Sequence, residues 1–311
     1  MSLAPFVRIV ARGKGRARAL TQDEAQEAMR LILDDQAQPE AVGALLMVLR
    51  LRGEEPQEIA GFTAALRQHT QHNLPKADLD WPVYAAGRTR GAPLFLLAAR
   101  LVSHAGYSVA MHGWNSHQAD GASVRDSLSM AGPDVTYTAL EELSPQAFRL
   151  LTLRDTFGLR SCINTVLRMW NPSDAPATVQ GVFHPTYRSL QAEAAALLGQ
   201  QTLTIIKGGG GEFERHPAKD IALFGLRDGR HIQEPAPALR QETRRLHDTD
   251  QVTDLADLWQ GRDTDPFAIA TVTGTAALAL WTLNAAPDLT QAQHVADTLW
   301  ETRHQPERLQ A

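Results

Sequence analysis

Two arginines, Arg88 and Arg90, lie in a short loop between two apolar stretches. Residues 83–86 predict a strand, and Pro93 opens the helix that follows. In α/β proteins ligands bind beyond the carboxyl ends of parallel strands, and a guanidinium can hold a phosphate through two hydrogen bonds. We therefore expect Gly87, Arg88 and Arg90 to form a phosphate-binding loop. The alternative is a pair of solvated loop arginines.

A second candidate phosphate loop follows the strand predicted over residues 202–206. Lys207 precedes four consecutive glycines, of which Gly208 is the first. Glycine lets backbone N–H groups approach an anion closely because no Cβ stands in the way, and Lys207 adds a positive charge. A glycine run is equally typical of a flexible turn, and the sequence leaves both interpretations open.

His112 and Trp114 follow another predicted strand, residues 108–111. They could hydrogen-bond or stack on a nucleobase, or His112 could be a histidine satisfied inside the protein. Neither His112 nor His117 has a partner at the spacing of a metal site, so we predict no metal. The sequence shows no catalytic group and no cofactor motif. The remaining candidate phosphate-binding cations are Arg154, Arg168 and Arg188.

The elements that must position these residues fall into two groups. Helices are predicted at 21–33, where Thr21 and Glu24 form a capping box, at 39–51, and from residue 56 onward. Strands then alternate with helices, which predicts an α/β class with a mostly parallel sheet behind a small all-helical domain. We place the small helical domain at 1–76, joined by helices within about 144–172, and the large α/β domain at 80–311. The predicted strands are 83–86, 108–111, 179–183, 202–206 and 221–226.

Charge is distributed unevenly along the 311 residues, whose formal net charge is −5. Residues 1–20, the basic arm, contain basic side chains and no acidic ones. The acidic side chains in excess lie in residues 21–80 and 241–311. The nearly neutral segment between them can therefore still present a positive face. Cys162 is the single cysteine and cannot form an internal disulfide. No apolar run is long enough to cross a membrane, and the start lacks a signal-peptide pattern. We expect a cytoplasmic protein that does not bind a membrane.

Residues 8–230 resemble the anthranilate phosphoribosyltransferase family. The most specific match is Arg154-x-x-Phe-Gly-x-Arg160-Ser-x-Ile-Asn164, followed by Asn171-Pro172. The resemblance implies a small helical domain on a large α/β domain, and a dimer formed through the helical part. It also implies that Arg154 and Arg160 lie near the acceptor site. We expect Arg154 to contact a ligand and Arg160 to support the fold.

Several positions differ from the family's pattern. Residues 86–91, with two arginines, replace the glycine-rich G-T-G-G-D loop, and Met111 replaces the phosphate-binding lysine. Phe213-Glu214 stands where the family has the D-E pair that holds magnesium, and residues 167–169 replace the G-P-L turn. Bare backbone amides and paired carboxylates hold a diphosphate and its Mg²⁺. These differences predict a donor site that no longer holds its donor.

The segments around Tyr84, Arg188 and Lys207 are similar to those of non-enzymatic family members that bind nucleic acid. We therefore expect a homodimer that binds nucleic acid with little sequence preference, with Trp114 or Tyr84 stacking on bases. One alternative is a phosphoribosyltransferase or other glycosyltransferase with a remodelled donor site. Another is a sensor that binds a small molecule or an anion.

Overall fold

Four helices form the N-terminal end of the chain in the computed structural model, which describes residues 2–13, 15–70, 74–84, 91–114, 124–242, 244–246 and 253–305. They are α1 (Ala4–Ala11), α2 (Gln22–Leu33), α3 (Pro39–Arg52) and α4 (Pro56–His69). The predicted capping box is present at the start of α2, where the Thr21 hydroxyl accepts from the Glu24 amide. Helix α1 lies within the basic arm, where charge alone predicts no helix.

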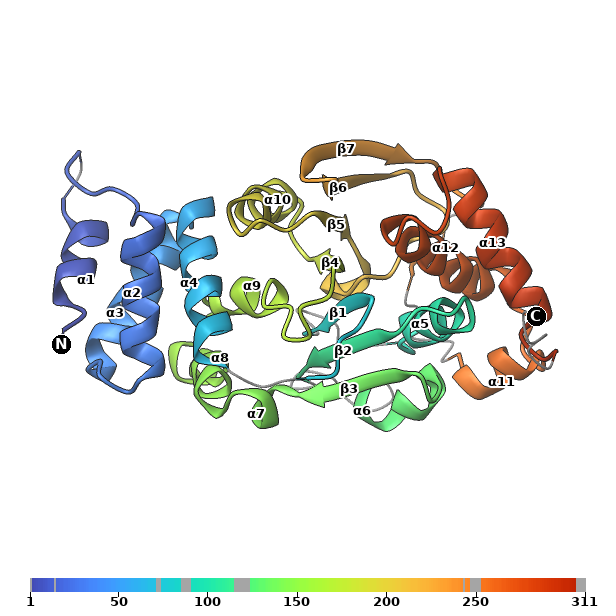
Figure 1. Cartoon of the computed structure of the whole chain (residues 1–311), viewed down its shortest axis with the longest axis horizontal. Coiled ribbons are helices and arrows are strands. Elements are labelled where there is room, and N and C mark those ends of the chain that lie inside the picture. The colour runs from blue at the N-terminus through green and yellow to red at the C-terminus, as the bar shows by residue number, and fades with distance from the viewer. Residues whose placement is uncertain are drawn as a thin grey trace.

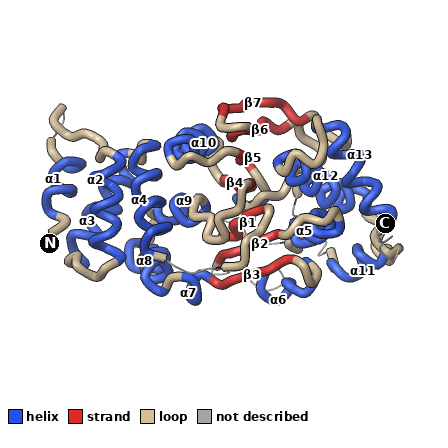
Figure 2. Tube along the Cα trace, viewed as in Figure 1, coloured by secondary structure: helices blue, strands red, loops and turns tan. Residues whose placement is uncertain are grey.

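A seven-stranded sheet follows, in the order β3-β2-β1-β4-β5-β6-β7 (Figure 2). Strands β1 to β5 run parallel, whereas β6 and β7 pair antiparallel at one edge. This confirms the predicted class, an all-helical domain with an α/β domain and a mostly parallel sheet. The strands are β1 (Leu79–Val83), β2 (Val109–Gly113), β3 (Val135–Ala139), β4 (Ala177–Val182), β5 (Thr202–Lys207), β6 (Ile221–Arg227) and β7 (Arg230–Ala236).

Helices cover both faces of the sheet because alternate strand residues point to opposite sides. In β5, Leu203 and Ile205 pack in the cluster that contains α10 and the N-terminal helices, whereas Ile206 packs in the cluster of α5, α12 and α13. The remaining helices are α5 (Phe95–His104), α6 (Val124–Ser127), α7 (Leu140–Leu143), α8 (Pro145–Phe157), α9 (Ile163–Arg168), α10 (Tyr187–Leu197), α11 (Leu255–Gln260), α12 (Pro266–Thr282) and α13 (Leu289–Thr302).

The helices predicted within about 144–172 are α8 and α9. Helix α8 ends at Phe157 and is followed by Gly158, which takes a left-handed conformation with φ of 67°, and α9 begins at Ile163. Glycine is favoured there because it has no Cβ to clash. Buried residues of both helices share one apolar cluster with α2, α3 and α4.

The carboxyl ends of the parallel strands face the N-terminal helices (Figure 1). At this edge of the sheet α9 contacts β1 and also packs against α4, so any ligand bound at the strand ends would lie close to the helical domain. Among the described residues, no helix is long and apolar enough to cross a membrane.

Candidate functional site

Gly87, Arg88 and Arg90 lie outside the residues that the structure describes. The described chain reaches Tyr84 at the end of β1 and resumes at Gly91, just before α5. The predicted loop therefore connects the carboxyl end of β1 to α5. Its contacts stay a prediction.

An arginine-lined cavity of about 90 Å³ opens between α3, α9 and the end of β4. Arg50 comes from the last turn of α3, Arg160 precedes α9, and Arg168 ends it. Among the described residues the lining contains these three arginines and no carboxylate. It is completed by Ser161, Asn164, Thr165, Val182, Phe183, His184, Tyr187 and Gln191.

The arginines of this cavity repel one another. Burial lowers the pKa of the Arg160 guanidinium, and the positive charges of Arg154, Arg168 and Arg50 lower it further. Arginine nevertheless stays protonated at neutral pH, so the cluster keeps its charge. A bound anion would favour the charged form of each group and relieve the repulsion.

Arg168, one of the predicted phosphate-binding residues, lies at the wall of the cavity with only 5% of its surface exposed. Its guanidinium donates to the carbonyls of Asn164, at 3.2 Å, and Tyr84, at 3.3 Å. Burial lowers the pKa of Arg168, while the negative charge of Glu212 opposes that shift. These bonds hold the Arg168 charge in place beside the cavity.

The sequence assigned Arg154 to the ligand and Arg160 to the fold, and the geometry favours the reverse. Arg160 lines the cavity, whereas Arg154 does not. The Nε of Arg154 lies 3.4 Å from the Asp155 carboxylate. Arg154 therefore acts on the cavity only through its charge, which lowers the pKa of Arg160. Arg50 was not among the candidates chosen from the sequence, and its place in the lining makes it a functional candidate that sequence reasoning missed.

A second cavity, of about 390 Å³, contains three further predicted phosphate-binding residues. Arg188, Lys207 and Gly208 all line it, together with Gly209, Gly210, His216, Lys219, Asp220, Ile221, Ala222 and Leu246. Gly208 is required where it stands, because a Cβ there would lie 1.7 Å from the Glu212 carbonyl oxygen. The two cavities are neighbours, since Val182 at the end of β4 pairs with Lys207 at the end of β5.

Arg188 is partly held by its own chain. Its Nε donates to the Pro185 carbonyl and its Nη1 to the Ala222 carbonyl, both at 3.1 Å, and its guanidinium lies 4.5 Å from the centre of the Phe224 ring. Lys207, by contrast, is exposed, as is Lys219. These two lysines are therefore the cations in this cavity best placed to meet an anion from solvent.

His112 is fully buried, which corrects the expectation that it faces a ligand. Its Nδ1 lies 2.9 Å from the Tyr84 hydroxyl, and its Nε2 lies 3.2 Å from the Asp80 carboxylate. Burial raises the pKa of the Tyr84 phenol well above its usual range, so that hydroxyl keeps its proton. The Tyr84 hydroxyl and Nδ1 form a hydrogen bond, whereas the contact between Nε2 and Asp80 lacks hydrogen-bond geometry. His112 is closed off inside the fold.

The aromatic residues proposed for base stacking are also engaged. Tyr84 is 3% exposed, and Trp114 packs edge-on against Phe148 of α8, with 5.3 Å between the ring centres. Phe183 was not selected from the sequence, yet it lines the arginine cavity and is 46% exposed. It directly follows a strand, so its pattern resembled that of a core residue. Only the structure shows that its ring reaches solvent.

Two buried glutamates lie near the strand ends. Glu212 and Glu214 are 1% and 0% exposed, and the Phe213 ring between them packs edge-on against Trp81. Glu214 accepts a hydrogen bond from the amide of Phe95, the first residue of α5, at 3.0 Å. The α5 N-terminus carries partial positive charge and thus already holds one carboxylate of the chain itself. Although Phe213 replaces one acid of the family's pair, two carboxylates remain in this segment.

The comparisons define the class of protein. The helical bundle domain of a glycosyl transferase family matches residues 6–70. The anthranilate phosphoribosyltransferase of Bacillus caldotenax is 30% identical over 231 residues, which are 68% of this chain and 94% of that protein. The enzyme of Thermus thermophilus is 32% identical over 206 residues, which are 60% of this chain but only 62% of the relative.

The crystal structure of an anthranilate phosphoribosyltransferase from Thermus thermophilus superposes with a TM-score of 0.72 at 22% identity, covering 91% of this chain and 92% of that chain. Fold and sequence agree. This chain belongs to the anthranilate phosphoribosyltransferase family.

Proposed function

We propose that this chain is a cytoplasmic homodimer that binds nucleic acid with little sequence preference and without catalysing phosphoribosyl transfer. The backbone phosphates would lie along the two cavities at the carboxyl ends of β4 and β5. One observation carries the proposal: Arg50, Arg160 and Arg168 line one cavity whose described lining contains no carboxylate, and Arg154 adds a further positive charge that acts on Arg160. Phosphates neutralise such clusters, and guanidinium groups bind them bidentately.

The direct test is an oligonucleotide titration at several salt concentrations. Each neutralised phosphate should contribute about −0.7 to −0.9 to the slope of log affinity against log salt. Changing Arg50 and Arg160 together to alanine should flatten that slope by about 1.4 to 1.8 and weaken unrelated sequences equally. The matched control removes Arg230 and Arg262, two arginines that line neither cavity. A wild-type protein that binds no oligonucleotide at low salt would overturn the proposal.

Phosphoribosyl transfer is the second candidate, favoured by family membership and by the two carboxylates Glu212 and Glu214. Mg²⁺ takes oxygen ligands and accompanies a diphosphate through one or two carboxylates, which these residues could supply. No group of three side chains suited to a metal occurs among the described residues, so the donor's own phosphates would have to complete the coordination.

This second candidate makes a separate prediction. Wild-type protein, phosphoribosyl diphosphate, Mg²⁺ and anthranilate should yield phosphoribosyl-anthranilate, and Glu212→Gln should abolish the product. Under the nucleic-acid-binding proposal, by contrast, we expect no phosphoribosyl-anthranilate and no Mg²⁺-dependent binding of the diphosphate. Turnover at the rate of ordinary enzymes, about 1 per second or faster, would make transfer the function of this chain.

A further inference from the structure

One aromatic ring at the strand ends is left in solvent. Four large apolar side chains of the described residues are exposed, and Phe183 is the aromatic one among them. Its ring stands nearly perpendicular to that of His184, at 81°, with 4.9 Å between their centres. An isolated exposed apolar residue is ordinary on a protein surface. This one is unusual in its position, because it lines the cavity that Arg50 and Arg160 make positive.

Phe183 also lies close to the second cavity. It follows Val182, whose register partner is Lys207, and neighbouring strands lie about 4.8 Å apart. Phe183 therefore lines the arginine-lined cavity at the end of one strand, and Lys207 lines the second cavity at the end of the neighbouring strand. Proteins that bind single-stranded nucleic acid combine a positive track for the backbone with aromatic rings for the bases.

We propose that Phe183 is a stacking platform for an unpaired base, so that this site prefers a single strand to a duplex. The inference rests on the proposed nucleic-acid-binding function and names its substrate class. A single strand can turn a base onto the ring while its flanking phosphates meet the cations of the two cavities. In a duplex the faces of each base are covered by the neighbouring bases, and only the base edges reach the grooves. Stacking on Phe183 therefore adds nothing to the binding of a duplex.

The experiment compares three probes of equal length: a single-stranded oligonucleotide, the same strand with its bases replaced by abasic sites, and a duplex. Phe183→Ala should weaken binding of the normal strand about 5-fold or more, the lower range of one base–aromatic stack. Binding of the abasic strand and the duplex should change less than about 2-fold. Phe183→Trp should retain the affinity of the wild type. The matched control is Leu197→Ala, since Leu197 is exposed to a similar degree, 50%, on α10 and lines neither cavity.

The outcomes separate the two proposals. If Phe183→Ala leaves the normal strand unaffected, or weakens the abasic strand equally, stacking on Phe183 is wrong and the phosphate site still stands. If the wild type binds neither the normal nor the abasic strand, the nucleic-acid function itself is wrong, and the stacking inference fails with it. Thermal unfolding of each variant shows whether it remains folded.

Discussion

At the scale of single residues, His112 shows how neighbours decide what a side chain can do. Asp80 on β1 accepts a hydrogen bond from Thr178 on β4, at 3.0 Å, through one carboxylate oxygen, while its other oxygen lies 3.2 Å from His112 on β2. Trp170 closes the histidine from another side, with 5.9 Å between the ring centres. The buried carboxylate therefore depends on contacts from both neighbouring strands.

We therefore predict that His112→Ala destabilises the protein and leaves nucleic-acid affinity unchanged. The substitution would bury the Asp80 carboxylate without its histidine partner, which costs about 3 kcal/mol or more. Urea denaturation measures the loss, and His231→Ala, at an exposed position on β7, should change stability by about 0.5 kcal/mol at most. A variant of full stability with weakened oligonucleotide binding would show instead that His112 contacts the ligand.

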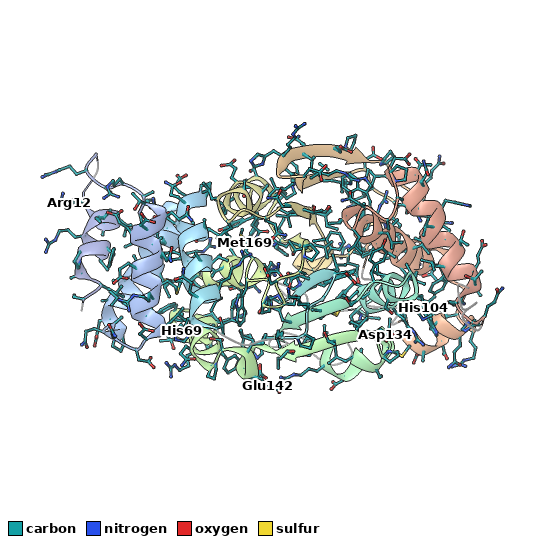
Figure 3. All side chains as sticks on the ribbon, in the orientation of Figure 1. Arg12, His69, His104, Asp134, Glu142 and Met169 are labelled. Carbon is teal, nitrogen blue, oxygen red and sulfur yellow. The ribbon has the colours of Figure 1, made fainter. Side chains whose placement is uncertain are left out.

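At the scale of elements, one arginine of the basic arm is bound to the start of α2. Arg18 donates two hydrogen bonds to the Glu24 carboxylate, at 2.6 Å and 2.7 Å. Arg12, beyond α1, points away from the molecule at the end opposite the C-terminal helices (Figure 3). Arg18 thus pairs with the carboxylate of the capping box of α2, and Arg12 is far from the strand ends. Neither arginine is therefore placed to contact a ligand at the strand ends.

The Arg18–Glu24 pair makes stability depend on acid pH. The Arg18 hydrogen bond lowers the pKa of Glu24 to about 2. Because the folded pKa is depressed, the stabilisation is present above the unfolded value of about 4.3 and is lost as the pH falls toward 2. Solvent screening keeps the effect small.

Arg18→Ala should therefore lower the melting temperature at about pH 7 more than at about pH 3, because at about pH 3 the wild type has already lost part of the stabilisation. The double variant Arg18→Ala/Glu24→Ala is the control, because it removes both members of the ion pair. Equal losses at the two pH values would contradict the assignment of Glu24.

At the scale of the whole molecule, the helical end is the proposed dimer face. Its helices α1 to α4 lie beyond the strand ends (Figure 1), and Leu51, in the last turn of α3, is 90% exposed. An apolar side chain so exposed on a short helical bundle gains from burial against a second copy. Arg50 is its chain neighbour, so assembly there would bring the dimer face close to the arginine cavity.

Light scattering at micromolar concentration should give about twice the chain mass of 34.1 kDa. Leu51→Glu should shift the protein toward the monomer, because a charge buried at an apolar interface is costly. Leu197→Glu introduces the same charge at an exposed apolar position on α10 and should leave the mass unchanged. A wild-type mass of one chain would reject the dimer.

The sequence by itself determined the class of fold and most of its elements. Capping boxes, proline starts and apolar periodicity are local signals, and they located α2, α3 and α4, as well as strands β4, β5 and β6 to within two residues. Strands β3 and β7 were missed because they are the sheet edges, where exposed polar residues such as Thr136 and Glu234 break the apolar pattern. The family motif around Arg154 and Asn164 was likewise readable, because it depends on order and spacing alone.

The make-up of the candidate site was decided only by the tertiary structure. Which arginine reaches the cavity depends on how α8, Gly158 and α9 turn, so Arg160 and Arg50 line it where sequence reasoning chose Arg154. The degree of burial, which no local pattern measures, makes His112 and Tyr84 inaccessible to a ligand and leaves Phe183 exposed. The cavities exist because β4 and β5 are neighbours in the sheet although their lining residues are far apart in the chain. Such long-range packing leaves no local signal in a single sequence.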